Sequence, residues 1–98
     1  MGKRKVTILE PAVEEVARIA LFIESEGLPQ TAKKFVDDAF AFFDTLSDDR
    51  FVHRPCKHTA WKALNLRCVN FRKKYIVSYL DNKSEIIICE FALQKNLK

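Results

Sequence analysis

Residues 75–88 read YIVSYLDNKSEIII, and this stretch decides the fold. Tyr75, Val77 and Tyr79 alternate with the residues between them, which is typical of a β-strand with two different faces. The polar run at 81–84 suits a hairpin turn, and the three isoleucines that follow predict another, strongly apolar strand. We therefore expect an antiparallel β-hairpin here.

The segment before this hairpin predicts one more strand and a long connection. Leu64, Leu66 and Cys68 alternate with polar residues, so a strand is expected to begin near residue 64. The basic run at 72–74 (RKK) then marks the tip of a second hairpin. Residues 47–62 show no periodicity, and we expect an irregular connection of a length that is often functional.

The first third of the chain predicts a short strand and two helices. Residues 5–9 (KVTIL) are β-branched and apolar, as in a strand. Pro11 and Pro29 each suit the first turn of a helix, where a missing N–H leaves no hydrogen bond unmade. Gly27 is expected to end the first helix as its C-terminal cap. The two helices form a hairpin.

Each helix is expected to bury one apolar face. The face of the first helix is predicted to consist of Val13, Val16, Ala17, Ala20 and Ile23. The stripe of the second helix is predicted to consist of Ala32, Phe35, Val36, Ala39, Phe43 and Leu46. Phe22 and Phe40 lie toward the edges of these stripes, so they are candidates for contact with a partner protein. The predicted order is β-α-α-β-β-β, an α+β fold in one domain over residues 1–98.

Composition limits the class of protein. The 98 residues hold no apolar run of about 18, so no membrane span is expected, and no signal peptide is recognised. We expect a cytoplasmic protein. Residues 10–49 carry a net charge of −7, residues 50–98 carry +8, and the whole chain carries +4. The basic half suggests a polyanionic or acidic partner, although a solubilising surface would give the same pattern.

The cysteines predict neither a disulfide framework nor a metal site. Cys56, Cys68 and Cys89 are odd in number and widely spaced, so we expect all three thiols to be reduced. His53, Cys56 and His58 lack a fourth ligand at a usual spacing, and we expect no metal. We expect no nucleotide cofactor either, because the glycine patterns of phosphate-binding loops are missing.

Several stretches resemble the RelE/ParE family of toxins from bacterial type II toxin–antitoxin modules. The junction at 27–35 (GLPQTAKKF) is similar to the family's helix–helix junction. The stretch at 61–67 (WKALNLR) resembles its second strand, which carries a characteristic arginine, here Arg67. The motif at 75–79 (YIVSY) resembles its third strand, and 86–88 (III) resembles its last. The likeness extends over nearly the whole chain.

The resemblance implies a small, mostly antiparallel sheet with the helical hairpin packed on one face and a concave, basic opposite face. It implies a cognate antitoxin that wraps the toxin with a flexible, often acidic segment, for which Phe22 and Phe40 are our candidate contacts. The implied target is mRNA on the ribosome in RelE-like members and DNA gyrase in ParE-like members.

The end of the last predicted strand departs from the pattern of the RelE-like nucleases. Their last strand carries an arginine where this chain has Glu90, and Leu93 and Gln94 stand where a histidine or tyrosine would follow. A carboxylate there would repel a phosphate, which favours inhibition by binding over mRNA cleavage. RNA cleavage and nucleic-acid binding without catalysis remain alternatives.

The candidate site residues follow from the need for cations beside a phosphate. Arg67 is the tentative catalytic cation, and His53 and His58 could serve as base or acid. The candidates for binding a nucleic acid or another target are Lys57, Lys62, Arg67, Arg72, Lys73 and Lys74. Trp61 could add base stacking, whereas Tyr75 and Tyr79 are expected to pack in the core or an interface.

Overall fold

The computed structural model describes residues 4–48, 53–82 and 84–96. The elements in chain order are β1 (Lys5–Ile8), α1 (Glu10–Ser25), α2 (Pro29–Thr45), α3 (Thr59–Ala63), β2 (Arg67–Phe71), β3 (Tyr75–Asn82), β4 (Glu85–Leu93) and the 3-10 turn η1 (Gln94–Asn96). The predicted order β-α-α-β-β-β is confirmed, with one short helix added in the connection.

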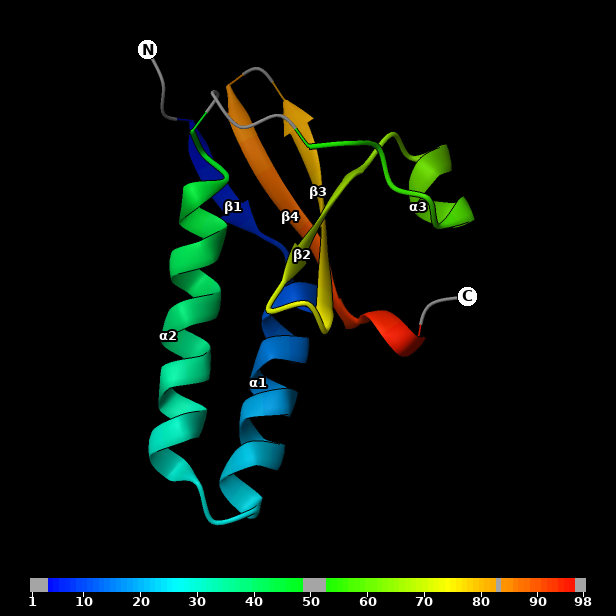
Figure 1. Ribbon diagram of the computed structural model, residues 1–98. Helices are drawn as coiled ribbons and strands as arrows, with labels where there is room; N and C mark the ends of the chain where they lie inside the picture. Colours follow the sequence, from blue (N-terminus) through cyan, green and yellow to red (C-terminus); the bar gives the residue numbers. More distant parts are fainter. Residues whose placement is uncertain (1–3, 49–52, 83, 97–98) are drawn as a thin grey trace.

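The four strands form one sheet in the order β1-β4-β3-β2. β1 pairs with β4 in parallel, and the other two pairs are antiparallel. A parallel pair needs a crossover between its strands, and the helical hairpin begins this crossover. Figure 1 shows α1 and α2 on one side of the sheet, while α3 and the C-terminal turn lie on the other side.

The expected helix boundaries are confirmed. Pro11 lies in the first turn of α1, and Pro29 begins α2. Gly27 has a φ of 84° and donates its N–H to the carbonyl of Glu24 at 2.9 Å. This left-handed conformation strains other L-residues, so glycine suits the position even though nothing lies within 4 Å of where a Cβ would be.

The buried face is as predicted for α2 but differs for α1. All six predicted residues of α2 and its C-cap are buried or half-buried. In α1 the buried residues are Ala12, Val16 and Ile19, whereas Val13 and Ala17 are exposed. Two sets of apolar residues at helical spacing run along α1, and only contact with α2 and β4 determines which set is buried.

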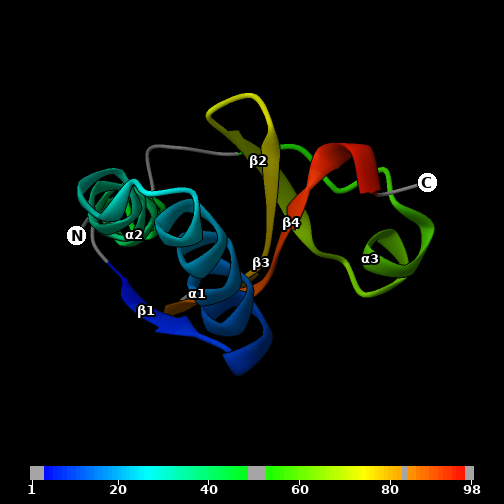
Figure 2. The same cartoon turned by 90° about the horizontal axis from the view of Figure 1, so that it is seen from below.

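The larger core lies between the hairpin and the sheet. Phe35, Phe43 and Phe91 are each at most 2 % exposed, and Phe91 contacts both of the other rings edge to face. Tyr79, also 2 % exposed, belongs to this core, and half-buried Tyr75 packs against it, as expected. A smaller cluster, formed by Cys56, Trp61 and Leu66, lies on the opposite face of the sheet. Figure 2 shows from below that α1 and α2 lie on one side of the strands and α3 on the other.

The connection between α2 and β2 differs from the prediction. Residues 59–63 form α3, and β2 begins at Arg67 rather than near residue 64. Asn65 has a φ of 61°, so the chain turns there and cannot continue an extended strand through it. The side-chain alternation of residues 64–68 therefore arises from a helix end and turn followed by a strand.

The expectation of three reduced thiols is wrong for two of them. Cys56 and Cys68 form a disulfide with Cα atoms 4.8 Å apart, while Cys89 is a free cysteine. An antiparallel bridge between Pro55 and Arg67 brings the two cysteines together. The sequence separation of 12 residues does not reveal this pairing, because it depends on the path of the irregular connection.

Candidate nucleic-acid interface

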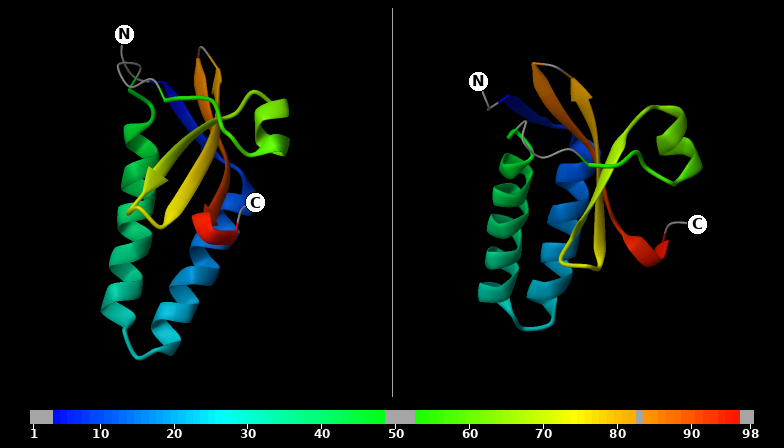
Figure 3. Two further views of the ribbon diagram at one scale, coloured as in Figure 1. Left: turned by 45° about the vertical axis from the view of Figure 1, so that its right-hand side comes forward. Right: turned by 45° about the horizontal axis from the view of Figure 1, so that its top comes forward.

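A groove lies between the connection and the sheet, on the face opposite the helical hairpin. Its volume is about 540 Å³. The lining residues are Arg54, Pro55, Lys57, His58, Cys68, Asn70, Ile76 and Gln94. In Figure 3 the green connection with α3 stands away from the strands on this side of the molecule. One bank of the groove is thus the connection, and the floor and other bank come from β2, β3 and η1.

A second hollow of about 520 Å³ continues from this groove. Its lining residues are Lys73, Lys74, Tyr75, Leu93, Gln94 and Lys95. Gln94 borders both hollows, and its Oε1 accepts a hydrogen bond from Asn70 Nδ2 at 3.1 Å. The two hollows together form a basic surface with five lysines or arginines and His58, and no lining residue among those described is acidic. A chain of phosphates fits such a surface.

His58 lies on the bank of the groove that the connection forms. Its ring lies 5.1 Å from that of Trp61, and its Nδ1 atom is buried with no hydrogen-bond partner among the described residues. A buried polar atom of this kind is costly unless it is satisfied.

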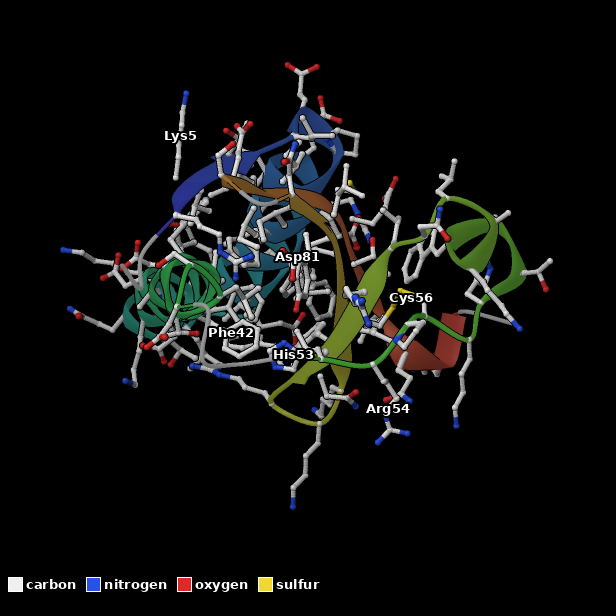
Figure 4. The ribbon with its side chains drawn as sticks, turned by 90° about the horizontal axis from the view of Figure 1, so that it is seen from above. Lys5, Phe42, His53, Arg54, Cys56 and Asp81 are labelled. Atoms are coloured by element: carbon white, nitrogen blue, oxygen red, sulfur yellow. A yellow bond between two sulfur atoms is a disulfide. The ribbon has the colours of Figure 1, made fainter. Side chains whose placement is uncertain are left out.

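Arg67 and His53 lie away from this groove. Arg67 pairs in the sheet with Tyr79, which faces the helical core. The Arg67 guanidinium donates a hydrogen bond of 3.1 Å to the backbone carbonyl of His53. The phenol of Tyr79 is 2.7 Å from His53 Nδ1. Figure 4 shows His53 toward Phe42 and α2, while Arg54 and Cys56 lie farther toward α3. The connection therefore crosses from one face of the sheet to the other after His53.

The electrostatics of the His53–Tyr79 pair favour its neutral form. Burial, with a smaller contribution from the charge of Asp81, raises the pKa of Tyr79 to about 12. Burial also lowers the pKa of His53. A protonated phenol beside a neutral imidazole suits a hydrogen bond from the Tyr79 O–H to Nδ1. The contact between Tyr79 and His53 holds the connection in place. Because Tyr79 is 2 % exposed, a large substrate cannot reach this pair.

The remaining predicted cations divide between the two faces. Arg72 pairs with Asp38 of α2, and its guanidinium carbon lies 5.5 Å and 5.3 Å from the ring centres of Phe35 and Phe71. It therefore belongs to the helical side. Lys62 is exposed on α3 but lines neither hollow, so Lys57, Lys73 and Lys74 are the predicted residues that the structure brings to the basic surface.

Sequence reasoning missed Arg54, Asn70, Gln94 and Lys95 as parts of this surface. Asn70 could have been found, because strand alternation places it opposite the buried Phe71. The others lie in irregular segments, where no period predicts the direction of a side chain.

Glu90 lies beside the groove rather than in it. In the sheet it pairs with Ser78, and Ser78 pairs with Cys68, which lines the groove. Ser78 is fully buried, and its Oγ has no hydrogen-bond partner among the described residues. The described part of the chain has no group of three or more His, Cys, Asp or Glu placed to hold a metal ion. It also has no helix both long and apolar enough to cross a membrane.

Comparison with known proteins supports the fold. No protein-family model and no curated protein matches the sequence. Among solved structures, a chain of the chromosomal ParDE TA system from P. aeruginosa superposes with a TM-score of 0.75 at 15% sequence identity. The superposition covers 93% of this chain and 96% of that chain. The expected RelE/ParE-like fold is thereby confirmed.

Proposed function

We propose that this chain is the toxin of a type II toxin–antitoxin module and that it inhibits growth by binding its target, as ParE-like members do. Its fold is shared along nearly the full length of both chains with a member of a ParDE system. The motifs at 75–79 and 86–88 lie in β3 and β4, and the motif at 27–35 joins α1 to α2. Its target and its antitoxin would both be met in the cytoplasm.

The observation that favours target binding over RNA cleavage is the separation of the candidate catalytic groups. Metal-free RNA cleavage needs a base, an acid and cations around one phosphate. Here Arg67, His53 and Tyr79 contact one another on the helical side, whereas His58 and the basic hollows lie on the other face. Glu90 adds a negative charge next to the groove. This arrangement can hold an anion but does not surround one with catalytic groups.

The antitoxin contact is proposed on the helical hairpin. Phe22 is 66% exposed, and Leu9, Val13, Leu21 and Leu28 are exposed apolar side chains of the same hairpin. A partner helix binds such a surface through a few apolar side chains. Phe40 is half-buried and packs edge to face on Phe43 at 5.6 Å, so Phe22 is the more accessible of the two predicted contacts.

The proposal is tested by induced expression in a bacterial host, with and without the small gene adjacent to this one. We expect growth arrest that co-expression of the neighbour relieves. Primer extension on cellular mRNA and a gyrase supercoiling assay then separate the targets, and we expect inhibited supercoiling without discrete mRNA cuts. Codon-linked cuts that vanish in Arg67→Ala would establish RelE-like cleavage instead. Normal growth at high expression of folded protein would contradict the toxin proposal.

The basic surface favours a second candidate function, nucleic-acid binding without catalysis. Five cationic side chains line two joined hollows, and Asn70 and Gln94 add hydrogen-bonding groups between them. Binding through phosphates weakens steeply as salt rises, whereas a protein target held by apolar contacts depends less on salt. The salt dependence of binding to a single-stranded oligonucleotide therefore distinguishes this function from the first.

A further inference from the structure

The Cys56–Cys68 disulfide joins the two banks of the groove. Cys56 belongs to the connection, and Cys68 is the second residue of β2 and lines the groove itself. The bond closes a loop that contains α3 and the basic residues Lys57 and Lys62. Residues 54–58 form the bank of the groove that belongs to the connection, called here the Arg54–His58 bank. The disulfide therefore holds this bank against the sheet.

Apart from the contacts of His53 just before it, few other interactions among the described residues hold that bank. Two backbone hydrogen bonds flank the disulfide, from Cys56 N–H to the Leu66 carbonyl at 2.9 Å and from Cys68 N–H to the Arg54 carbonyl at 3.1 Å. Among the residues that the structure describes, the smaller apolar cluster has three buried members, whereas the hairpin-side core has thirteen. A segment with so little buried apolar contact opens at low free-energy cost once a covalent link is removed.

The bond is also within reach of solvent. Cys56 is 2 % exposed, but half-buried Cys68 faces the groove, so a small thiol can attack the Cys68 sulfur from that side. The third cysteine, Cys89, is a poor nucleophile for attack on this disulfide. Burial raises the pKa of Cys89 and keeps it as a weakly nucleophilic thiol.

We propose that Cys56 and Cys68 form a reversible redox site that fixes or releases the Arg54–His58 bank of the groove. The co-reactant is a low-molecular-weight thiol of the glutathione class. Its thiolate attacks the disulfide to give a mixed disulfide, and a second thiol resolves it. Two thiols become one external disulfide, while Cys56 and Cys68 gain two electrons and two protons. An external disulfide reverses the reaction.

The first measurement establishes the redox site. The folded protein is equilibrated in buffers with different ratios of reduced and oxidised glutathione, quenched in acid, denatured, alkylated with iodoacetamide and weighed by mass spectrometry. We expect one label, on Cys89, at oxidising ratios and three at reducing ratios. Three labels at every ratio, or one label even with excess reduced glutathione, would overturn the proposal.

The second measurement tests release of the bank without reference to any target. Trypsin can cut after Lys57 and Lys62 within the loop, and after Lys33 and Lys34 of α2 as an internal control. We expect at least a tenfold faster cut in the loop of the reduced protein, with no change in α2. Equal loop rates in both redox states would overturn the proposal, and neither result depends on whether the chain is a toxin.

Matched variants assign the effect to the bond. Cys56→Ser combined with Cys68→Ser should show the fast loop cleavage in either buffer, whereas Cys89→Ser should behave as the unmodified protein does. If the double variant does not fold, the reduced natural sequence serves as the open state in the same comparison. A Cys89→Ser protein that loses the redox response would contradict the assignment to Cys56 and Cys68.

Discussion

The two faces of the sheet are built in different ways. The face under the helical hairpin carries large aromatic side chains, and there Phe91 contacts both Phe35 and Phe43. The opposite face carries a small cluster, a disulfide and a basic groove formed by an irregular connection. The first face thus supplies most of the apolar burial that stabilises the fold. The residues of the second face contribute less to stability, so packing constrains their shape and charge less. This division places stability and binding on separate sets of residues.

The largest effect is expected from Phe43→Ala. Phe43 is fully buried in the hairpin-side core, so its loss should lower the free energy of unfolding by about 3–5 kcal/mol. Trp61→Ala removes a larger side chain from the smaller cluster and should cost less, because the core and the disulfide remain. Urea unfolding measures both, with Leu64→Ala, at an exposed position, as a control near zero. Equal losses of unfolding free energy for Phe43→Ala and Trp61→Ala would show that the two faces contribute equally to stability.

The Tyr79–His53 pair predicts an alkaline loss of stability on the hairpin side. Because the folded pKa of Tyr79 is raised to about 12, the folded state favours the protonated phenol. Its contribution is fully present below the unfolded pKa of about 10 and is lost as the pH rises toward 12. The loss should be about 1 kcal/mol per pH unit, or ~2–3 kcal/mol in total.

Urea unfolding of the natural protein and of Tyr79→Phe from pH 8 to 11.5 checks this dependence. The difference between the two proteins should be constant up to about pH 9.5 and then shrink, since the variant cannot ionise at this position. A difference that stays constant to pH 11.5 would show that Tyr79 ionises as an exposed tyrosine does.

The antitoxin surface provides a third test, on the outer side of the hairpin. Phe22→Asp should weaken antitoxin binding by about 2 kcal/mol or more without changing the unfolding free energy, because Phe22 is 66% exposed. Phe40→Asp should instead destabilise the toxin, since Phe40 packs against the core. Calorimetric titration with the neighbouring gene product and urea unfolding separate these effects. Unchanged binding by folded Phe22→Asp would remove Phe22 from the interface.

A smaller effect is expected on the groove side. Arg54→Ala combined with Lys57→Ala should weaken binding of a ten-nucleotide single-stranded RNA about tenfold near physiological salt. The slope of log affinity against log salt should fall by about 1 to 2, because two phosphate contacts are lost. Arg72→Ala is the matched control, since Arg72 pairs with Asp38 on the helical side. Equal losses in the control would show that overall charge, and not the groove, determines binding.

The sequence predicted the hairpin-side face well, because periodic burial produces periodic sequence. The stripe of α2 and the alternation in β3 are examples, and Pro29 and Gly27 added the helix boundaries. The prediction for α1 was right at Val16 and at half-buried Ala20 and Ile23, but wrong at Val13 and Ala17. Ala12 and Ile19 are buried instead, and only packing distinguishes them from those two equally apolar residues. The groove could not be predicted as a unit, because Arg54, Asn70 and Gln94 meet through the path of the connection. The Cys56–Cys68 pairing was missed for the same reason.

The smallest expected effect concerns the tip between β2 and β3, where the two faces meet. Arg72 and Lys73 have φ values of 53° and 65°, although neither is a glycine. The left-handed conformation costs an L-residue on the order of 1 kcal/mol, so contacts elsewhere must hold this turn. Arg72 has such contacts on Asp38, Phe35 and Phe71, whereas Lys73 is exposed and borders the second hollow.

Lys73→Gly should therefore stabilise the protein by about 0.5–1 kcal/mol, since glycine adopts this φ without strain. Arg72→Gly relieves the same strain but loses the ion pair and the ring contacts, so it should be neutral or destabilising. Urea unfolding of both variants measures the difference. If Lys73→Gly stabilises the fold but also weakens RNA binding, the strained lysine contributes to the basic surface. If it stabilises the fold and leaves binding unchanged, Lys73 lies outside the surface that binds RNA, although it borders the second hollow.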